Sequence, residues 1–167
     1  KFSLIWAFNP CPCGFLGDKE KLCTCNSSKI AKYRSRLSGP ILDRIDIFIN
    51  VPRVKITELD AQKEAKESSE DFRKIVEKAL KIQKKRFEWT TQTYNSEMTN
   101  EDIEKYCALW EKENEFIKNA IERLNLSTRA YFRILKLART IADIDDSENI
   151  CLNHLAEAIG YRKGEEM

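Results

Sequence analysis

Ser127–Ile144, "STRAYFRILKLARTIADI", decides the fold of the second half of the chain. Apolar side chains recur along it every three or four positions, which is the spacing of one face of an α-helix. Ser127 precedes the first of them and is a good N-cap, because its hydroxyl can accept a hydrogen bond from the first turn. The stretch therefore predicts a long helix with one buried face, formed by Tyr131, Ile134, Leu135, Ala138, Ile141 and Ala142.

Helical patterns continue on both sides of this stretch. Residues 64–86 are long, charged and rich in helix formers, and residues 150–162 predict a short closing helix. Between them, Asn100 is a candidate cap for a further helical region that follows a polar connector. We therefore predict that residues 56–167 fold as a helical domain.

The first part of the chain has a different pattern. Residues 2–8, "FSLIWAF", and residues 41–51, "ILDRIDIFINV", predict two strands, with a helix over 26–37 between them. Two strands do not form a stable sheet by themselves. We expect residues 1–55 to be the end of an α/β domain whose other strands precede Lys1. The predicted fold class is an α/β remnant followed by an all-α, mostly helical unit.

Composition excludes little else. The chain has 167 residues, a formal charge of +2 and 34% charged residues, which by itself indicates neither a nucleic-acid binder nor a membrane binder. No apolar run approaches the roughly 18–20 residues that span a membrane. With no start methionine and no signal-peptide pattern, the chain is interpreted as an internal piece of a longer protein.

Four of the six cysteines lie close together, as the Cys-x-Cys pairs Cys11, Cys13 and Cys23, Cys25. Four thiolates on two short hairpins can hold a structural zinc ion in a tetrahedron. Two disulfides or free thiols remain alternatives, and an iron–sulfur cluster has no further support. Catalytic zinc is disfavoured, because the single histidine, His154, is far along the chain and is expected on a helix face. Cys107 and Cys151 are expected to be small core residues.

Three polar residues could carry chemistry, and each also has a simpler interpretation. Arg44 lies between two aspartates and could form a plain ion pair, or it could reach a phosphoryl group on a neighbouring subunit. Asn9 ends the first predicted strand and could orient a water or form an Asx turn. Arg129 opposes the helix dipole at a helix start. The basic stretches at 29–36 and 81–86 are interpreted as solvated helix faces.

The strings "LIWAFNPCPCG", "KYRSRLSGPILDRIDIFINVPRV" and "LSTRAYFRILKLARTIADID" together resemble the magnesium-chelatase-like AAA+ ATPases. The double Cys-x-Cys is most similar to the bacterial ComM/YifB branch of that family. The resemblance is dense over 4–53 and 124–162 and weak over 57–120. It implies that residues 1–55 are the end of a P-loop ATPase core and that residues 56–167 are its helical lid.

The resemblance also implies roles. Asn9 matches sensor 1, which positions the attacking water; Arg44 matches an arginine finger offered in trans; and Arg129 matches the sensor 2 arginine, which acts on the nucleotide. The implied full-length protein binds ATP and Mg²⁺, forms a homohexamer and is cytoplasmic. No Gly-x-x-x-x-Gly-Lys-Ser/Thr occurs in this sequence, so we predict that this chain alone has no measurable ATPase.

The implied activity is that of a DNA motor, acting in branch migration, natural transformation and recombination. Two rival functions remain open at this point. One is a zinc-bearing nucleic-acid-binding module, although Asp18, Lys19, Glu20 and Lys21 cancel one another's charge beside the cysteines. The other is a metal-inserting motor like magnesium chelatase itself.

Overall fold

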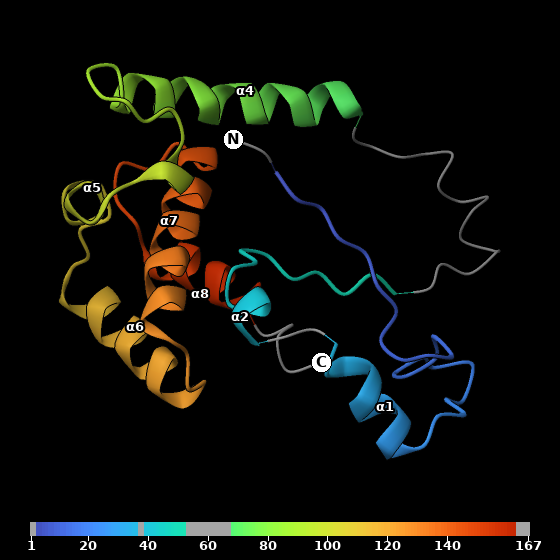
Figure 1. Ribbon diagram of the computed structural model, residues 1–167. Helices are drawn as coiled ribbons and strands as arrows, with labels where there is room; N and C mark the ends of the chain where they lie inside the picture. The colour runs from blue at the N-terminus through green and yellow to red at the C-terminus, as the bar shows by residue number, and fades with distance from the viewer. Residues whose placement is uncertain (1–2, 37–38, 53–67, 163–167) are drawn as a thin grey trace.

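The computed structural model describes residues 3–36, 39–52 and 68–162, and it is helical (Figure 1). The first part of the chain contributes two short helices, α1 and α2, and the rest contributes a bundle. The elements are α1 (Ser27–Arg34), α2 (Gly39–Leu42), α4 (Ser69–Arg86), the 3₁₀ turn η2 (Asn95–Glu97), α5 (Asn100–Tyr106), α6 (Glu111–Arg123), α7 (Thr128–Ile144) and α8 (Leu152–Gly160).

The helix predicted from residues 127–144 is the centre of the bundle. α7 contacts α4, η2, α5 and α8, and α6 packs against α8; Figure 1 shows α4 lying across one end of α7. The buried face of α7 includes Ile134, Leu135, Ala138 and Ala142, as its periodicity predicts. The buried apolar cluster runs from Phe87 to Ile159, so its members all come from the second half of the chain.

A polar network crosses the α4–α7 contact. The buried carboxylate of Asp143 accepts hydrogen bonds from Arg86 at 2.7 and 2.5 Å and from Arg139 Nε at 3.1 Å. Asn95, also buried, donates to Asp143 at 2.8 Å and accepts from Arg86 at 2.7 Å. Interpreting 81–86 as a solvated face is therefore wrong for Arg86 and for the buried Gln83, whose amide oxygen accepts from the Asn95 backbone N–H.

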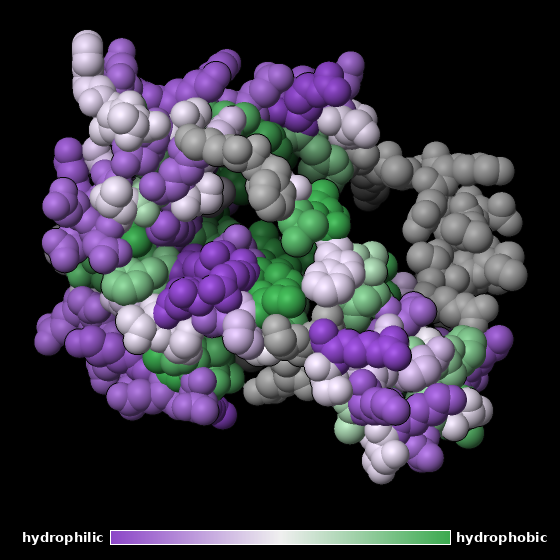
Figure 2. Space-filling model, in the orientation of Figure 1, coloured by the Kyte–Doolittle hydropathy of each residue, from purple (hydrophilic) through white to green (hydrophobic). Residues whose placement is uncertain are grey.

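α4 is only partly packed. Its second half contacts α7, whereas three apolar side chains of its first half are exposed: Phe72, Ile75 and Val76. Figure 2 shows hydrophilic side chains over the outer surface of α4 and hydrophobic ones open beneath it. The predicted helix began at residue 64, and α4 begins at Ser69; residues 64–67 lie outside the described residues.

Of the two predicted caps, Ser127 is confirmed and Asn100 is one residue off. Ser127 Oγ accepts from the Ala130 N–H at 3.1 Å, and Asn26 Oδ1 accepts from the Lys29 N–H at 2.8 Å. The cap of α5 is Thr99 rather than Asn100, and it forms a capping box with Asp102. Thr99 has the acid three positions later that a capping box needs, and this signal identifies it in the sequence.

The predicted strands are wrong for the residues that the structure describes. Residues 3–8 and 45–52 are irregular, and none of the described ranges contains a β-strand. Their apolar side chains face outward: Ile5 is 95% exposed and Val51 80% exposed. A strand is held by hydrogen bonds to a neighbouring strand, and these segments have no such neighbour here. The predicted boundary between residues 55 and 56 lies outside the described residues and stays a prediction.

Cys107, Cys151 and His154 differ in burial. Cys107 is a core residue as predicted, and burial raises the pKa of its thiol to about 11. Cys151 is exposed at the start of α8, so its predicted place in the core is wrong. His154 lies on α8 but on its buried face, where Nε2 is 3.1 Å from Asp145 Oδ2 and Nδ1 accepts from the Cys151 N–H. Among the described residues, no helix combines the length and the apolar character that crossing a membrane requires.

Candidate functional site

The loop over residues 11–25 folds back on itself and brings the two cysteine pairs together. Gly14 and Gly17 both have φ of +81°, a conformation that side chains other than glycine rarely adopt. The Gly14 N–H donates to the Cys11 carbonyl at 3.0 Å and closes the first turn. Asp18 Oδ1 then accepts from the backbone N–H groups of Glu20 and Lys21 at 2.7 and 2.9 Å, which turns the chain back toward Cys23.

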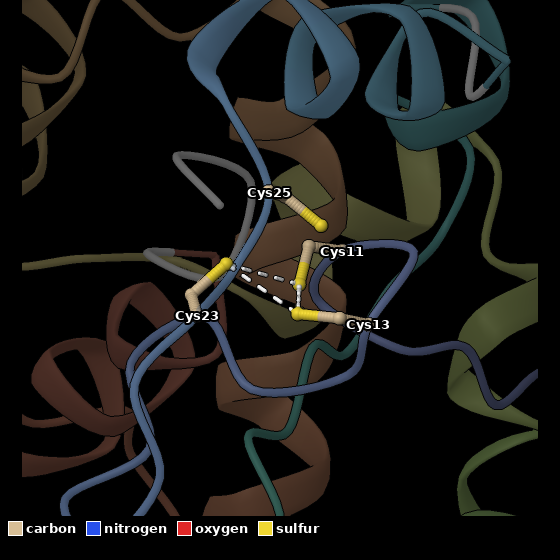
Figure 3. Close-up of side chains that lie close together, drawn as sticks. All are labelled: Cys11, Cys13, Cys23 and Cys25. Carbon is tan, nitrogen blue, oxygen red and sulfur yellow. Dashed lines mark hydrogen bonds between the residues drawn. The ribbon is translucent and has the colours of Figure 1, made fainter.

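The four sulfur atoms converge (Figure 3). Cys11 Sγ lies 3.4 Å from Cys13 Sγ and 3.7 Å from Cys23 Sγ, and the Cys13–Cys23 separation is 3.5 Å. All four sulfurs, including that of Cys25, lie within 4.8 Å of one another. None of the four cysteines is in a disulfide bond, because these separations are well beyond an S–S bond of about 2.05 Å. The geometry favours the metal interpretation over the disulfide alternative.

The same spacing fits a zinc ion. Four thiolates at a Zn–S distance of about 2.3 Å form a tetrahedron whose edges are about 3.8 Å long, close to the observed sulfur separations. Cys11 is fully buried and the other three sulfurs are partly covered, so the centre is closed, as structural zinc sites are. The residues present therefore fit a structural Zn²⁺, which would cross-link the two ends of the loop.

The clustered thiols differ widely in pKa, because each affects the ionisation of its neighbours. The backbone N–H of Phe15 lowers the pKa of the Cys13 thiol to about 5, with a further contribution from the Thr24 N–H. At Cys23 the Cys25 N–H lowers the pKa, but desolvation and the neighbouring thiols Cys13 and Cys11 outweigh it and raise the pKa to about 12. Adjacent like charges prevent four thiols from ionising together. A bound dication removes that obstacle, since metal ligation deprotonates thiols outright.

Arg44 and Arg129 lie on two segments that contact each other, the turn after α2 and the start of α7. Arg44 follows α2 in an exposed turn, and its Nη1 donates to the Pro40 carbonyl at 2.6 Å. Arg129 is in the first turn of α7, with Nη1 3.6 Å from Asp43 Oδ2. Asp43 immediately precedes Arg44, so the segment that carries Arg44 is in contact with the helix that carries Arg129. The role of Arg129 as sensor 2 stays a prediction, and its partner here is Asp43.

Asn9 is at the end of the extended segment, directly before the cysteine loop. Its side chain is exposed and lies against Gly14, where an added Cβ would be 3.9 Å from Asn9 Cγ. Within the described part of the chain, no hydrogen bond or ion pair joins Asn9 to Arg44 or Arg129. The structure thus brings the two arginine-bearing segments together and leaves Asn9 with the cysteines.

Sequence reasoning missed the residues that make the contact between the two parts. Ser127 Oγ donates to Asp43 Oδ1 at 2.7 Å, in addition to capping α7. After α8, Arg162 donates to the Ile45 carbonyl, and the Phe48 N–H donates to the Tyr161 carbonyl at 2.9 Å. The available signal was the pair of aspartates in "LDRID". In the structure these aspartates form ion pairs with Arg129 and Arg133.

Comparison with known proteins identifies the family. Residues 66–162 match the family described as magnesium chelatase, subunit ChlI C-terminal, and residues 1–59 match the one described as magnesium chelatase, subunit ChlI. The chain belongs to the magnesium chelatase ChlI family. The two matched regions lie on either side of residues 60–65. The ion pair between Asp43 and Arg129 connects one matched region to the other.

Similar proteins place the chain in the ComM/YifB branch of the ChlI family. It is 39% identical over 163 residues to competence protein ComM of Haemophilus influenzae and 36% identical over 162 residues to the protein YifB of Salmonella typhimurium. A Mycobacterium tuberculosis protein, Rv2897c, is 26% identical over 163 residues. The matches cover 97–98% of this chain but only 31–32% of the relatives, so the chain spans about a third of their length.

Proposed function

We propose that this chain is the nucleotide-sensing and lid portion of a hexameric AAA+ ATPase that acts as a cytoplasmic DNA motor. In this proposal Arg44 is the arginine finger for a neighbouring subunit, Arg129 is the sensor 2 arginine and Asn9 is sensor 1. ATP and Mg²⁺ bind to the core of the full-length protein. The cysteine loop holds one structural Zn²⁺ next to sensor 1. The name of the relative competence protein ComM supports a role in natural transformation.

One observation carries this proposal. Arg44 is exposed on a turn whose preceding residue, Asp43, is bonded to Ser127 and Arg129 at the start of α7. An exposed, permanently charged guanidinium on a braced turn suits stabilisation of a transferring phosphoryl group across a subunit interface. A plain ion pair at Arg44 would place an acid within reach of it, yet among the described residues the partner of its guanidinium is the Pro40 carbonyl.

The test is turnover by the full-length protein with Arg44→Ala. Loss of an arginine finger reduces ATP turnover by about 10³-fold or more, and ATP binding should remain nearly intact because the phosphate-binding loop lies elsewhere. Arg123→Ala is a matched control, since it removes an exposed arginine at the end of α6. Normal turnover in Arg44→Ala, or an equal loss in Arg123→Ala, would refute the finger assignment.

A second candidate function is a motor that inserts a metal ion, which the description of the family favours. Assays of strand migration and of metal chelation on the full-length protein separate the two motors. The rival without a motor, a zinc-bearing nucleic-acid-binding module, requires DNA binding by this chain that chelation abolishes, together with no ATPase in the full-length protein.

A further inference from the structure

We propose that Asp43 is a positioning residue that ties the finger segment to the lid, so that the position of Arg44 depends on the position of α7. This inference rests on the proposed function for the roles of Arg44 and Arg129. It goes beyond those roles because it assigns the link between them to one carboxylate within the same subunit.

Three donors from two places in the lid converge on Asp43. Ser127 Oγ donates to its Oδ1 at 2.7 Å, and Arg129 Nη1 lies 3.6 Å from its Oδ2. From the residues that follow α8, Arg162 Nη2 lies 3.8 Å from Oδ1. The Asp43 side chain is only 26% exposed, and Arg162 is buried. A carboxylate with partners at the start of α7 and after α8 fixes the segment in place more firmly than an isolated surface ion pair does.

The backbone of Arg44 moves with that of Asp43. The Asp43 N–H donates to the Gly39 carbonyl at 2.9 Å, and the Arg44 and Ile45 N–H groups donate to Ile41 and Leu42 at 2.9 and 3.0 Å. Asp43 and Arg44 therefore belong to one hydrogen-bonded turn, in which neighbouring Cα atoms are about 3.8 Å apart. A displacement of Asp43 must displace the Arg44 backbone with it.

Other contacts hold the same segment but do not reach the sensor arginine. Asp46 forms an ion pair with Arg133, one turn further along α7, and the Arg162 guanidinium lies over the Phe48 ring at 5.7 Å. Asp43 differs from these residues because its own carboxylate contacts Arg129. A movement of α7 that carries Arg129 toward a nucleotide thus acts on the turn that carries Arg44. Lid movement in one subunit would then adjust the finger that this subunit offers to its neighbour.

The experiment compares Asp43→Asn with Asp46→Asn in the full-length protein. Asp43→Asn is expected to lower kcat for ATP by about tenfold with KM changed by less than about twofold, because the carboxylate does not contact the nucleotide. Asp43→Glu, which keeps the charge, should recover part of the loss. Asp46→Asn removes an ion pair from the same segment and should stay within about twofold of the parent protein.

A merely structural role would give a different pattern. It would lower the melting temperature and affect kcat in both variants, without recovery in Asp43→Glu. That pattern, or normal kcat in Asp43→Asn, would overturn the inference.

Hydrogen exchange separates this inference from the finger assignment. In the present chain, Asp43→Asn should speed amide exchange at Arg44 and Ile45, whatever Arg44 does in catalysis. Unchanged exchange would refute the tether even where Arg44→Ala abolishes turnover. Faster exchange together with normal turnover in Arg44→Ala would instead refute the proposed function.

Discussion

Asp143 has the most demanding environment of any single described carboxylate. It is fully buried and accepts hydrogen bonds from two arginines and from Asn95. Burying a charge is tolerable only when partners satisfy it. Arg139 is buried as well, and Asp143 is the carboxylate that neutralises it. The network therefore specifies how α4 packs on α7.

We predict that Asp143→Ala destabilises this chain by about 3–5 kcal/mol, because it leaves the buried Arg139 and the largely covered Arg86 without their carboxylate. Lys78→Ala is the control, since it removes only the surface ion pair with Asp146 and should cost less than about 1 kcal/mol. Urea unfolding followed by circular dichroism measures both. Equal costs for the two variants would show that the network contributes no more than a surface pair.

At this scale the sequence shows residue types but not their partners. Arg129, Asp43 and Asp46 are visible as charged residues, yet their contacts cross more than 80 positions of the chain. In sequence, the basic run at 81–86 has the pattern of a solvent-exposed helix face. Only the structure shows that Arg86 in this run contacts Asp143 on α7. Local sequence does not identify a contact with a distant residue, so the buried polar residues were missed. Ile134 and Leu135 were predicted correctly, because helical periodicity alone places them on the buried face.

The helices follow from local rules, and α5 tests one of them. Its N-cap Thr99 accepts from the Asp102 N–H at 3.2 Å, and the Asp102 carboxylate accepts from the Thr99 N–H at 2.8 Å. Thr99→Ala should therefore destabilise the chain by about 0.5–2 kcal/mol. Asn100→Ala should change stability by less than about 0.5 kcal/mol. Thermal unfolding that ranks Asn100 above Thr99 would contradict the assigned start of α5.

The two extended segments, residues 3–8 and 45–52, show that local sequence patterns do not suffice to predict strands. Periodicity suffices for a helix, because its hydrogen bonds are internal, and so α7 was predictable from residues 127–144 alone. A strand depends on neighbours that the pattern itself does not contain. Residues 3–8 and 45–52 have the composition of strands, but no strand pairs with them in the described part of the chain and they are largely exposed.

The cysteine loop makes a prediction of its own. Protein prepared without a metal-affinity tag should contain about one zinc ion per chain by elemental analysis, and Cys13→Ser should lose most of it. A chelator should release the four clustered thiols while the helical signal changes little, because the buried cluster runs only from Phe87 to Ile159.

Cys151→Ser is the matched control for the cysteine loop. It removes an exposed thiol outside the cluster and should leave the zinc content unchanged. Protein that contains no zinc and has four free clustered thiols would refute the metal centre. A loss of zinc in Cys151→Ser equal to that in Cys13→Ser would refute it as well.

For the whole molecule, the described structure has two parts of different character. The helical part has its own apolar core, whereas residues 3–36 and 39–52 expose apolar side chains, and residues 43–48 contact the helical part. Such an arrangement suits a lid that follows the end of a larger core. The chain spans about a third of the length of its relatives.

The most direct test of the central claim uses mixed hexamers of the full-length protein. Subunits with Arg44→Ala and subunits with a disabled ATP-binding loop should each be inactive alone. Mixing them places an intact pocket beside an intact finger, so ATP turnover should return once native mass spectrometry shows mixed assemblies. Mixed hexamers that stay inactive would contradict a finger that acts in trans.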